Sequence, residues 1–152
     1  MDDRCPIRAS IPADSARIAE LERVCFPDPW SAAGIQEVLE APHCLGYVAE
    51  LNGVVVGYGL ARWVAETGEI LNLAVEPPHR RRGIAEALLG EILAALAGRG
   101  AQEVFLEVRE SNLPARVLYR SRGFSLAGMR RAYYRHPVED ALVLRLSLTG
   151  VA

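Results

Sequence analysis

A single carboxylate interrupts an otherwise apolar run near position 107. Glu107 follows Leu106 and precedes Val108 in the segment EVFLEVRE. A carboxylate among apolar neighbours must be ion-paired, exposed in a cleft or shifted to a higher pKa. In the first case Glu107 is structural, with Arg109 or Arg116 as its partner. In the second it is a candidate general base, and the residues alone leave both interpretations open.

Three consecutive arginines, at positions 80–82, stand directly before Gly83 and a helical pattern. The N-terminus of a helix carries partial positive charge, so arginines there are unfavourable unless an anion binds beside them. Gly83 and Ala85 leave room for a ligand to approach the free backbone N–H groups. The segment therefore indicates a site for a polyanion such as a pyrophosphate, with a solvated arginine run as the alternative.

The residues from Arg80 to Ala85 fit the pattern R/Q-x-x-G-x-G/A, and this turn resembles the one with which the GNAT superfamily of N-acetyltransferases holds the pyrophosphate of acetyl-CoA. Further segments are similar to the bacterial members that acetylate the N-terminal alanine of a ribosomal protein. These segments are FPDPWS (26–31), LNLAVEPPHRRRGIA (71–85), FLEVRESNLPARVLYRSRGF (105–124) and RRAYYRHPVEDALVLRL (130–146).

The resemblance implies a role for each matching residue. Glu107 would be the general base, and Tyr119 would be the acid that protonates the departing CoA sulfur. The Val75 N–H would stabilise the oxyanion. The acetyl-CoA site would comprise Leu73, Ala74, Val75, Arg81, Arg82, Gly83, Ile84, Ala85, Glu86 and Asn112. On the residues alone, Tyr119 could instead be a packing tyrosine and Asn112 a helix N-cap.

Three aromatic residues mark a candidate acceptor site. Tyr133 and Tyr134 lie among arginines in a predicted loop, and Trp30 follows a proline-rich turn. They could clamp an extended peptide or simply pack against the sheet. A protein α-amino group has a pKa of about 7.7–8.0, against about 10.4 for lysine, so a weak base suits the former better. We expect a protein N-terminus as acceptor, with a lysine side chain or small amine as the alternative and a non-catalytic acetyl-CoA-binding module as the third hypothesis.

The composition narrows the function classes. The chain has 152 residues, 51% hydrophobic and 24% charged, which predicts one globular domain over residues 1–152. All 17 basic residues are arginine, so lysine-based chemistry is excluded. The cysteines, Cys5, Cys25 and Cys44, lack the number and spacing of a disulfide framework or zinc site, and we expect no metal. Direct transfer is favoured over a ping-pong route through Cys25 or Cys44.

Charge and hydropathy bear on partners and location. The net charge of −2 argues against a nucleic-acid partner. No apolar run approaches the ~20 residues needed to cross a bilayer, and the N-terminus does not resemble a secretory signal. We expect a cytoplasmic protein without a membrane partner, acting as a monomer or weak dimer.

The hydrophobic periodicity predicts an α/β domain with helices flanking one mixed sheet. Helices are expected at 11–25, 31–40, 84–97 and 112–122, and strands at 6–10, 44–51, 54–63, 69–75, 103–108, 124–130 and 139–148. In the first helix, Ile18, Leu21, Val24 and Cys25 form the predicted apolar face. The unit at 69–108 should be a right-handed parallel crossover. The resemblance further implies that the sheet is mostly antiparallel and that the two parallel strands splay apart to admit the pantetheine arm.

Overall fold

One seven-stranded sheet organises the part of the chain that the computed structural model describes, residues 5–149. Residues 1–4, which belong to the N-terminal segment considered above, and residues 150–152 lie outside it. The strands are β1 (Ile7–Ala9), β2 (Cys44–Leu51), β3 (Val54–Val64), β4 (Thr67–Val75), β5 (Glu103–Arg109), β6 (Ser125–Tyr134) and β7 (Glu139–Ser147), in the spatial order β1-β2-β3-β4-β5-β7-β6. Only the β4–β5 pair is parallel among these neighbours, which confirms the predicted mixed, mostly antiparallel sheet.

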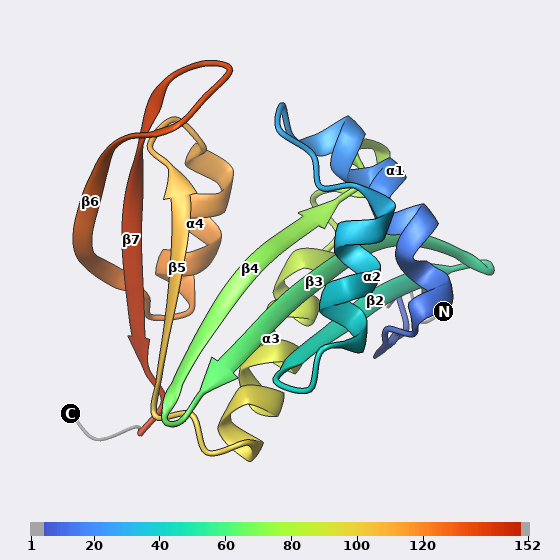
Figure 1. Ribbon diagram of the computed structural model, residues 1–152, viewed down its shortest axis with the longest axis horizontal. Coiled ribbons are helices and arrows are strands. Elements are labelled where there is room, and N and C mark those ends of the chain that lie inside the picture. The colour runs from blue at the N-terminus through green and yellow to red at the C-terminus, as the bar shows by residue number, and fades with distance from the viewer. Residues whose placement is uncertain (1–4, 150–152) are drawn as a thin grey trace.

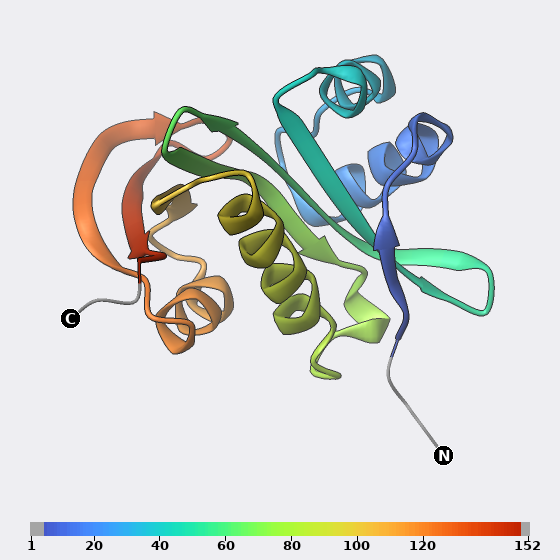
Figure 2. The ribbon, with the colours of Figure 1, turned by 90° about the horizontal axis from the view of Figure 1, so that it is seen from below.

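The helices cover both faces of this sheet. They are α1 (Ser15–Cys25), α2 (Ala32–Glu40), α3 (Ile84–Gly98) and α4 (Leu113–Ser121), with short 3₁₀ turns at η1 (Pro12–Asp14) and η2 (Pro77–His79). Helices α1 and α2 lie on one face, and α3 and α4 lie on the other (Figures 1 and 2). We call these the α1 face and the α3 face. None of the described helices combines the length and apolar character that a bilayer crossing requires.

Local sequence signals explain several boundaries. Ser31 caps α2, accepting a hydrogen bond from the Gly34 N–H at 3.1 Å, as predicted. Asn52 and Gly53 form the tight turn between β2 and β3 with φ values of 52° and 80°. This is the left-handed pair that an Asn-Gly hairpin turn requires.

The apolar face of α1 differs from the prediction at two positions. Val24 is 63% exposed, whereas Glu22 is completely buried. Tyr58 and Asn72 supply hydrogen-bond donors to the Glu22 carboxylate, and these partners permit a charged group in the core. The prediction was wrong here because periodicity assigns buried positions to apolar residues and cannot see donors from distant strands.

The parallel strands β4 and β5 separate soon after they pair. Residues 67–70 pair with residues 103–106, and the two strands then diverge into a V (Figure 1). In the β3–β4 register, Leu60 pairs with Asn72 and Ala61 with Ile70, so Leu71 has no partner in β3. Such a bulge bends its strand. Residues 71–75 of β4 consequently leave their β5-facing edge without a neighbouring strand.

Strand β6 extends further than the sequence predicted. The predicted aromatic loop is wrong, because Tyr133 and Tyr134 end β6 and Tyr134 pairs with Glu139. The β6–β7 register is irregular between Arg130 and Tyr134, and Ala132 has a φ of 50°. These irregularities break the alternation on which the strand prediction relied.

Candidate active site

A cavity of about 400 Å³ opens where β4 and β5 separate. Its lining comes from α1 and the loop after it, from β4 and β5, from α4 and from the end of β6. Seven residues selected from the sequence line it: Trp30, Leu73, Glu107, Asn112, Tyr119, Tyr133 and Tyr134. Catalytic and acceptor candidates from distant parts of the chain therefore meet in one space.

Glu107 and Tyr119 approach this space from opposite faces of the sheet. Side chains alternate along β5, so Glu107 projects with Arg109, which lies 3.6 Å from Asp28 in the loop after α1. Leu106 projects the other way and belongs to the core cluster that contains Tyr119 and α3 side chains. The gap between β4 and β5 thus connects a carboxylate on the α1 face with a tyrosine on the α3 face.

The Glu107 carboxylate is ion-paired but remains partly accessible to solvent. Its Oε1 lies 3.0 Å from the Arg130 Nε, and its side chain is 24% exposed. The partner is on β6, not the Arg109 or Arg116 considered from the sequence. Because Arg130 is 59% exposed, its pair with Glu107 is weak and easily opened. A hydrogen bond toward Glu107 raises the pKa of Tyr133.

Tyr119 is buried on α4 and packs edge-on against Phe124, with ring centroids 5.5 Å apart. Within residues 5–149, no hydrogen-bond partner reaches its hydroxyl. Burial raises the pKa of Tyr119, so the hydroxyl stays protonated at neutral pH. Tyr119 therefore packs in the core and presents a protonated side chain at the cavity.

The backbone of β4 presents donors to the gap. The Glu76 N–H donates to the Val56 carbonyl of β3 at 2.8 Å. Backbone groups alternate in direction along an extended strand, so the N–H groups of Val75 and Leu73 point away from β3 and toward β5. The backbone of Ala74 faces β3 instead. Beyond Ile70, β5 no longer pairs with the outward-facing donors.

The turn before α3 has the geometry of an anion-binding loop. Arg81 and Gly83 both have positive φ, at 65° and 78°, and no side chain caps the helix. Residues of this kind alternate their backbone so that successive N–H groups converge on one concavity. The first-turn N–H groups of Ile84, Ala85 and Glu86 have no partner within the helix.

Arg80 does not join this turn. Its Nε donates to the Val75 carbonyl at 2.9 Å, and its guanidinium lies 3.6 Å from the Cys25 Sγ. The Arg80 side chain, although exposed, therefore braces the end of β4, and the exposed Arg81 and Arg82 are left for the turn. Burial raises the pKa of the Cys25 thiol, which makes it a poor nucleophile at neutral pH.

Asn112 is a helix N-cap, one of the two roles considered from the sequence, and it also lies at the cavity. Its side-chain oxygen accepts a hydrogen bond from the Ala115 N–H at 3.2 Å and so caps α4. The same residue lines the cavity. The cap fixes the start of the helix that carries Tyr119.

The aromatic candidates line the cavity from two segments that lie far apart in the sequence. Tyr133 and Tyr134 meet edge-to-face with centroids 5.1 Å apart, and Trp30 lies in the loop after α1. The Arg109 guanidinium stacks 4.5 Å from the Tyr134 ring centroid. Burial and the charge of Glu107 raise the pKa of Tyr134 to about 12.

Among the lining residues that were not selected from the sequence, two charged residues make contacts that shape the site. Glu22 lines the cavity, and burial raises its pKa. Arg109 donates to the carbonyls of Arg135 and Pro137, at 2.9 and 3.0 Å, and so fixes the β6–β7 connection. The signal for Glu22 was a carboxylate at helical spacing from Ile18 on a helix with an otherwise apolar face.

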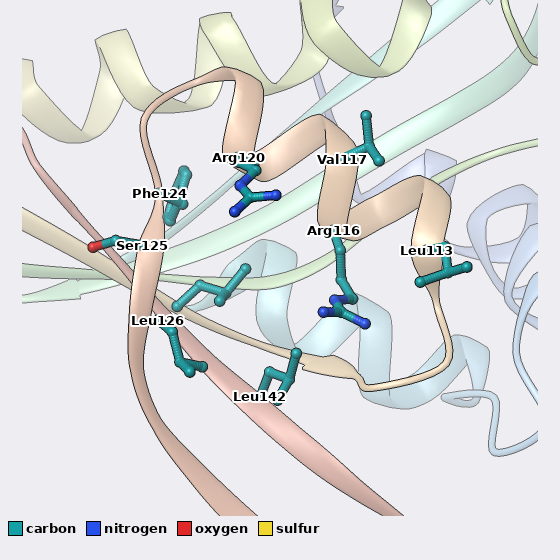
Figure 3. A pocket seen from close by; sticks show the side chains of 9 residues that line it. Leu113, Arg116, Val117, Arg120, Phe124, Ser125, Leu126 and Leu142 are labelled. Carbon is teal, nitrogen blue, oxygen red and sulfur yellow. The ribbon is translucent and has the colours of Figure 1, made fainter.

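A second cavity, of about 450 Å³, lies on the other side of α4 (Figure 3). Its lining is Leu113, Arg116, Val117, Arg120, Phe124, Ser125, Leu126, Leu142 and Leu144. Figure 3 shows Arg116 and Arg120 extending from α4 above the leucines. The lining contains no carboxylate or imidazole, so it lacks a group for proton transfer near neutral pH.

The sequence is similar to those of known acetyltransferases. Residues 15–124 match the acetyltransferase (GNAT) family. The N-alpha-acetyltransferase RimI of Mycobacterium tuberculosis is 40% identical, over 88% of this chain and 86% of its own. The [ribosomal protein bS18]-alanine N-acetyltransferase of Escherichia coli K12 is 32% identical, over 85% of this chain and 88% of its own.

Solved structures share the fold over nearly the whole chain. The crystal structure of the ribosomal-protein-S18-alanine N-acetyltransferase from Escherichia coli superimposes with a TM-score of 0.89 at 28% identity, covering 98% of this chain and 97% of that one. The Arabidopsis thaliana NAA60 structure, solved with a bisubstrate analogue, has a TM-score of 0.88 at 22% identity, covering 97% of this chain and 100% of that one. At the latter identity the likeness concerns the fold alone.

Proposed function

Since this chain belongs to the acetyltransferase (GNAT) family and is an N-acetyltransferase, we propose that it transfers the acetyl group of acetyl-CoA directly to the N-terminal α-amino group of a protein. The acceptor is the N-terminal alanine of a ribosomal protein, a proposal supported by the names of the relatives at 40% and 32% identity. Such an acceptor would place the reaction in the cytoplasm.

The observation that carries the proposal is the gap between β4 and β5, which connects the two faces of the sheet. Acetyl-CoA enters on the α3 face, with its pyrophosphate at residues 81–86. Its pantetheine arm lies along residues 73–75, where the outward N–H groups of Leu73 and Val75 replace the contacts of a missing strand. Asn112 contacts the cofactor from the start of α4.

The acceptor enters on the α1 face. Trp30 lines the cavity from the loop after α1, and Tyr133 and Tyr134 line it from the end of β6. Flat aromatic walls can hold an extended peptide without reading much of its sequence. In this position the terminal amine would lie beside Glu107.

The reaction requires the acyl transfer, the loss of two protons from the amine nitrogen and the gain of one proton by the sulfur. Glu107 takes a proton from the α-ammonium group, and the free amine attacks the thioester carbon. The Val75 N–H stabilises the negative oxygen of the tetrahedral intermediate. As the carbon–sulfur bond breaks, Tyr119 protonates the sulfur, and the attacking nitrogen releases its second proton to solvent, from which Tyr119 is reprotonated. The products are the N-acetylated peptide and CoA.

The acceptor is tested with two peptides, Ala-Arg-Tyr-Phe and acetyl-Ala-Arg-Lys-Phe, each supplied with acetyl-CoA and analysed by mass spectrometry. We expect acetylation of the first peptide at its α-amine and little reaction with the second. Acetylation of only the second, on its lysine, would overturn the proposal and establish a lysine acetyltransferase.

A further inference from the structure

We propose that Glu22 is a positioning residue that holds the acceptor wall, residues 26–30, against the sheet and thereby sets the affinity for the peptide acceptor. The inference rests on the proposed function, because it assigns this wall to the acceptor. Glu22 itself need not touch either substrate.

The Glu22 carboxylate joins four separate parts of the fold. It extends from α1, and its Oε1 accepts hydrogen bonds from the Tyr58 hydroxyl of β3, at 2.6 Å, and from the Asn72 Nδ2 of β4. Its Oε2 accepts a hydrogen bond from the Trp30 backbone N–H at 3.3 Å. The acceptor wall is thus tied directly to β3 and to β4, the strand at one edge of the gap.

The acceptor wall makes few other polar contacts with the rest of the protein. Pro27 and Pro29 have no backbone N–H to donate. In the part of the chain that the structure describes, the bond from Trp30 to Glu22 is the only hydrogen bond formed by residues 27–30. The remaining polar attachment is the ion pair between Asp28 and Arg109, at 3.6 Å, and Asp28 is 48% exposed. Loss of the Glu22 contact would therefore leave the wall held by this exposed ion pair and by the packing of Phe26 and Trp30 against the core.

The composition of the network also favours positioning. Glu22 is completely buried, and among residues 5–149 no arginine forms an ion pair with it. Only neutral donors compensate the charge of Glu22, so burying this carboxylate lowers the stability of the folded state. It does supply two oxygens that accept from three directions. Asn72 follows the bulged Leu71, so the same network connects the wall to the opening of the gap.

The test uses Glu22→Gln, which keeps the size of the side chain. Its amide oxygen can still accept from Tyr58 and Asn72, but its NH₂ group would face the Trp30 N–H, donor against donor. We expect the KM for Ala-Arg-Tyr-Phe to rise about tenfold or more, from the loss of a hydrogen bond to a charged group. The affinity for acetyl-CoA, measured by calorimetry, should change by less than about twofold.

The matched control is Glu20→Gln on the same helix. Glu20 is exposed and, among the residues that the structure describes, pairs only with Arg17, so the KM of Glu20→Gln should remain that of the wild type. Tyr58→Phe is a milder variant that keeps the carboxylate and removes one donor, and it should raise KM in the same direction by less. It tests the network even if Glu22→Gln fails to fold.

A second experiment measures the mobility and solvent exposure of the acceptor wall by fluorescence and does not depend on catalysis. The chain has two tryptophans, so Trp63→Phe leaves Trp30 as the only one. In this background Glu22→Gln should increase acrylamide quenching of Trp30 fluorescence and lower its anisotropy. Since Glu22 acts through the wall, Glu22→Gln should also add little to the KM effect of Trp30→Ala in a double-mutant cycle.

The outcomes separate the two proposals. If wild-type enzyme acetylates no peptide amine, the proposed function fails, and the fluorescence arm still decides the role of Glu22. If wild-type enzyme is active but folded Glu22→Gln has wild-type KM and quenching, the positioning role is refuted. An equal loss of acetyl-CoA affinity, or additive effects with Trp30→Ala, would also refute it by assigning Glu22 a general structural role.

Discussion

Glu107 and Tyr119, the two residues proposed to move protons, differ in how strongly their surroundings constrain them. Glu107 is partly exposed beside an exposed arginine partner, as a group that must exchange protons with solvent requires. Tyr119 is buried, and its raised pKa keeps the proton on the hydroxyl at neutral pH, where it can be donated as negative charge develops on the departing sulfur. The two environments therefore suit a base on the acceptor side and an acid on the cofactor side.

Glu107→Gln should lower kcat by roughly 10²–10⁴-fold near neutral pH, the usual contribution of a general base. The loss should shrink as the pH rises above the pKa of the amine, about 7.7–8.0, because the acceptor is then deprotonated without help. Steady-state rates between about pH 6 and pH 9 measure this. Glu103→Gln is the matched control, since Glu103 projects from the same face of β5 but pairs with Arg145 outside the gap. Equal rates for Glu107→Gln and wild type across this range would make Glu107 a structural residue.

Tyr119→Phe should lower kcat substantially while leaving the Kd for acetyl-CoA nearly unchanged. The ring keeps its packing against Phe124, and the hydroxyl acts only as the sulfur leaves, so its loss appears in the rate. Calorimetry gives the affinity, and a thiol-detection assay gives the rate. A parallel fall in affinity and rate would instead place Tyr119 in ground-state binding.

At the scale of elements, the turn that starts α3 makes the most specific prediction. Gly83 has a φ of 78°, and a Cβ there would meet no atom within 4 Å. Gly83→Val places a β-branched residue in a left-handed conformation, at a cost of about 1–2 kcal/mol, and fills the space above the free N–H groups. We expect strongly weakened acetyl-CoA binding in calorimetry.

Two further glycine variants separate strain from obstruction. Gly83→Asn tolerates the left-handed conformation, so its stability should stay close to that of the wild type while its side chain still crowds the turn. Gly98→Ala, at the other end of α3, meets no neighbour within 4 Å and should bind acetyl-CoA as the wild type does. Wild-type affinity in folded Gly83→Val would contradict the assignment of the pyrophosphate to this turn.

Features that depend on neighbouring residues were predictable from the sequence. Features that depend on contacts between distant segments were not. The Asn52-Gly53 turn, the Ser31 cap and the parallel crossover follow from neighbouring residues or chain connectivity. The bulge at Leu71 changes the β3–β4 register, so the residue periodicity of β4 alone does not show it. Likewise, Arg80 looks like its two neighbours in sequence, but only Arg80 reaches the Val75 carbonyl.

The candidate site likewise combines residues that a local sequence pattern indicates with residues that only the folded chain reveals. The motif residues Glu107, Tyr119 and Asn112 were found because each stands in a recognisable local pattern, and the structure brings them to one cavity. Glu22 was missed because its partners come from β3, β4 and the loop after α1, which only the folded chain assembles. The ion pair of Glu107 was assigned to neighbours in sequence, whereas the actual partner, Arg130, lies on β6.

At the scale of the whole molecule, the sheet separates the cofactor side from the acceptor side, and the gap between β4 and β5 connects them. Helices α3 and α4 and the arginine turn lie on one side, and the acceptor wall and the end of β6 approach the other (Figure 2). Two substrates can therefore occupy the enzyme together and react through the gap, without an acetylated cysteine. A covalent link between the substrates should then fit the enzyme better than either substrate alone.

The most direct test of this account uses a conjugate in which the sulfur of CoA is joined through an acetyl group to the α-amine of Ala-Arg-Tyr-Phe. We expect it to compete with both acetyl-CoA and the peptide and to bind at least about 10²-fold more tightly than either, because one molecule makes both sets of contacts. Competition with acetyl-CoA alone, at an affinity no better than that of CoA, would contradict direct transfer through the β4–β5 gap.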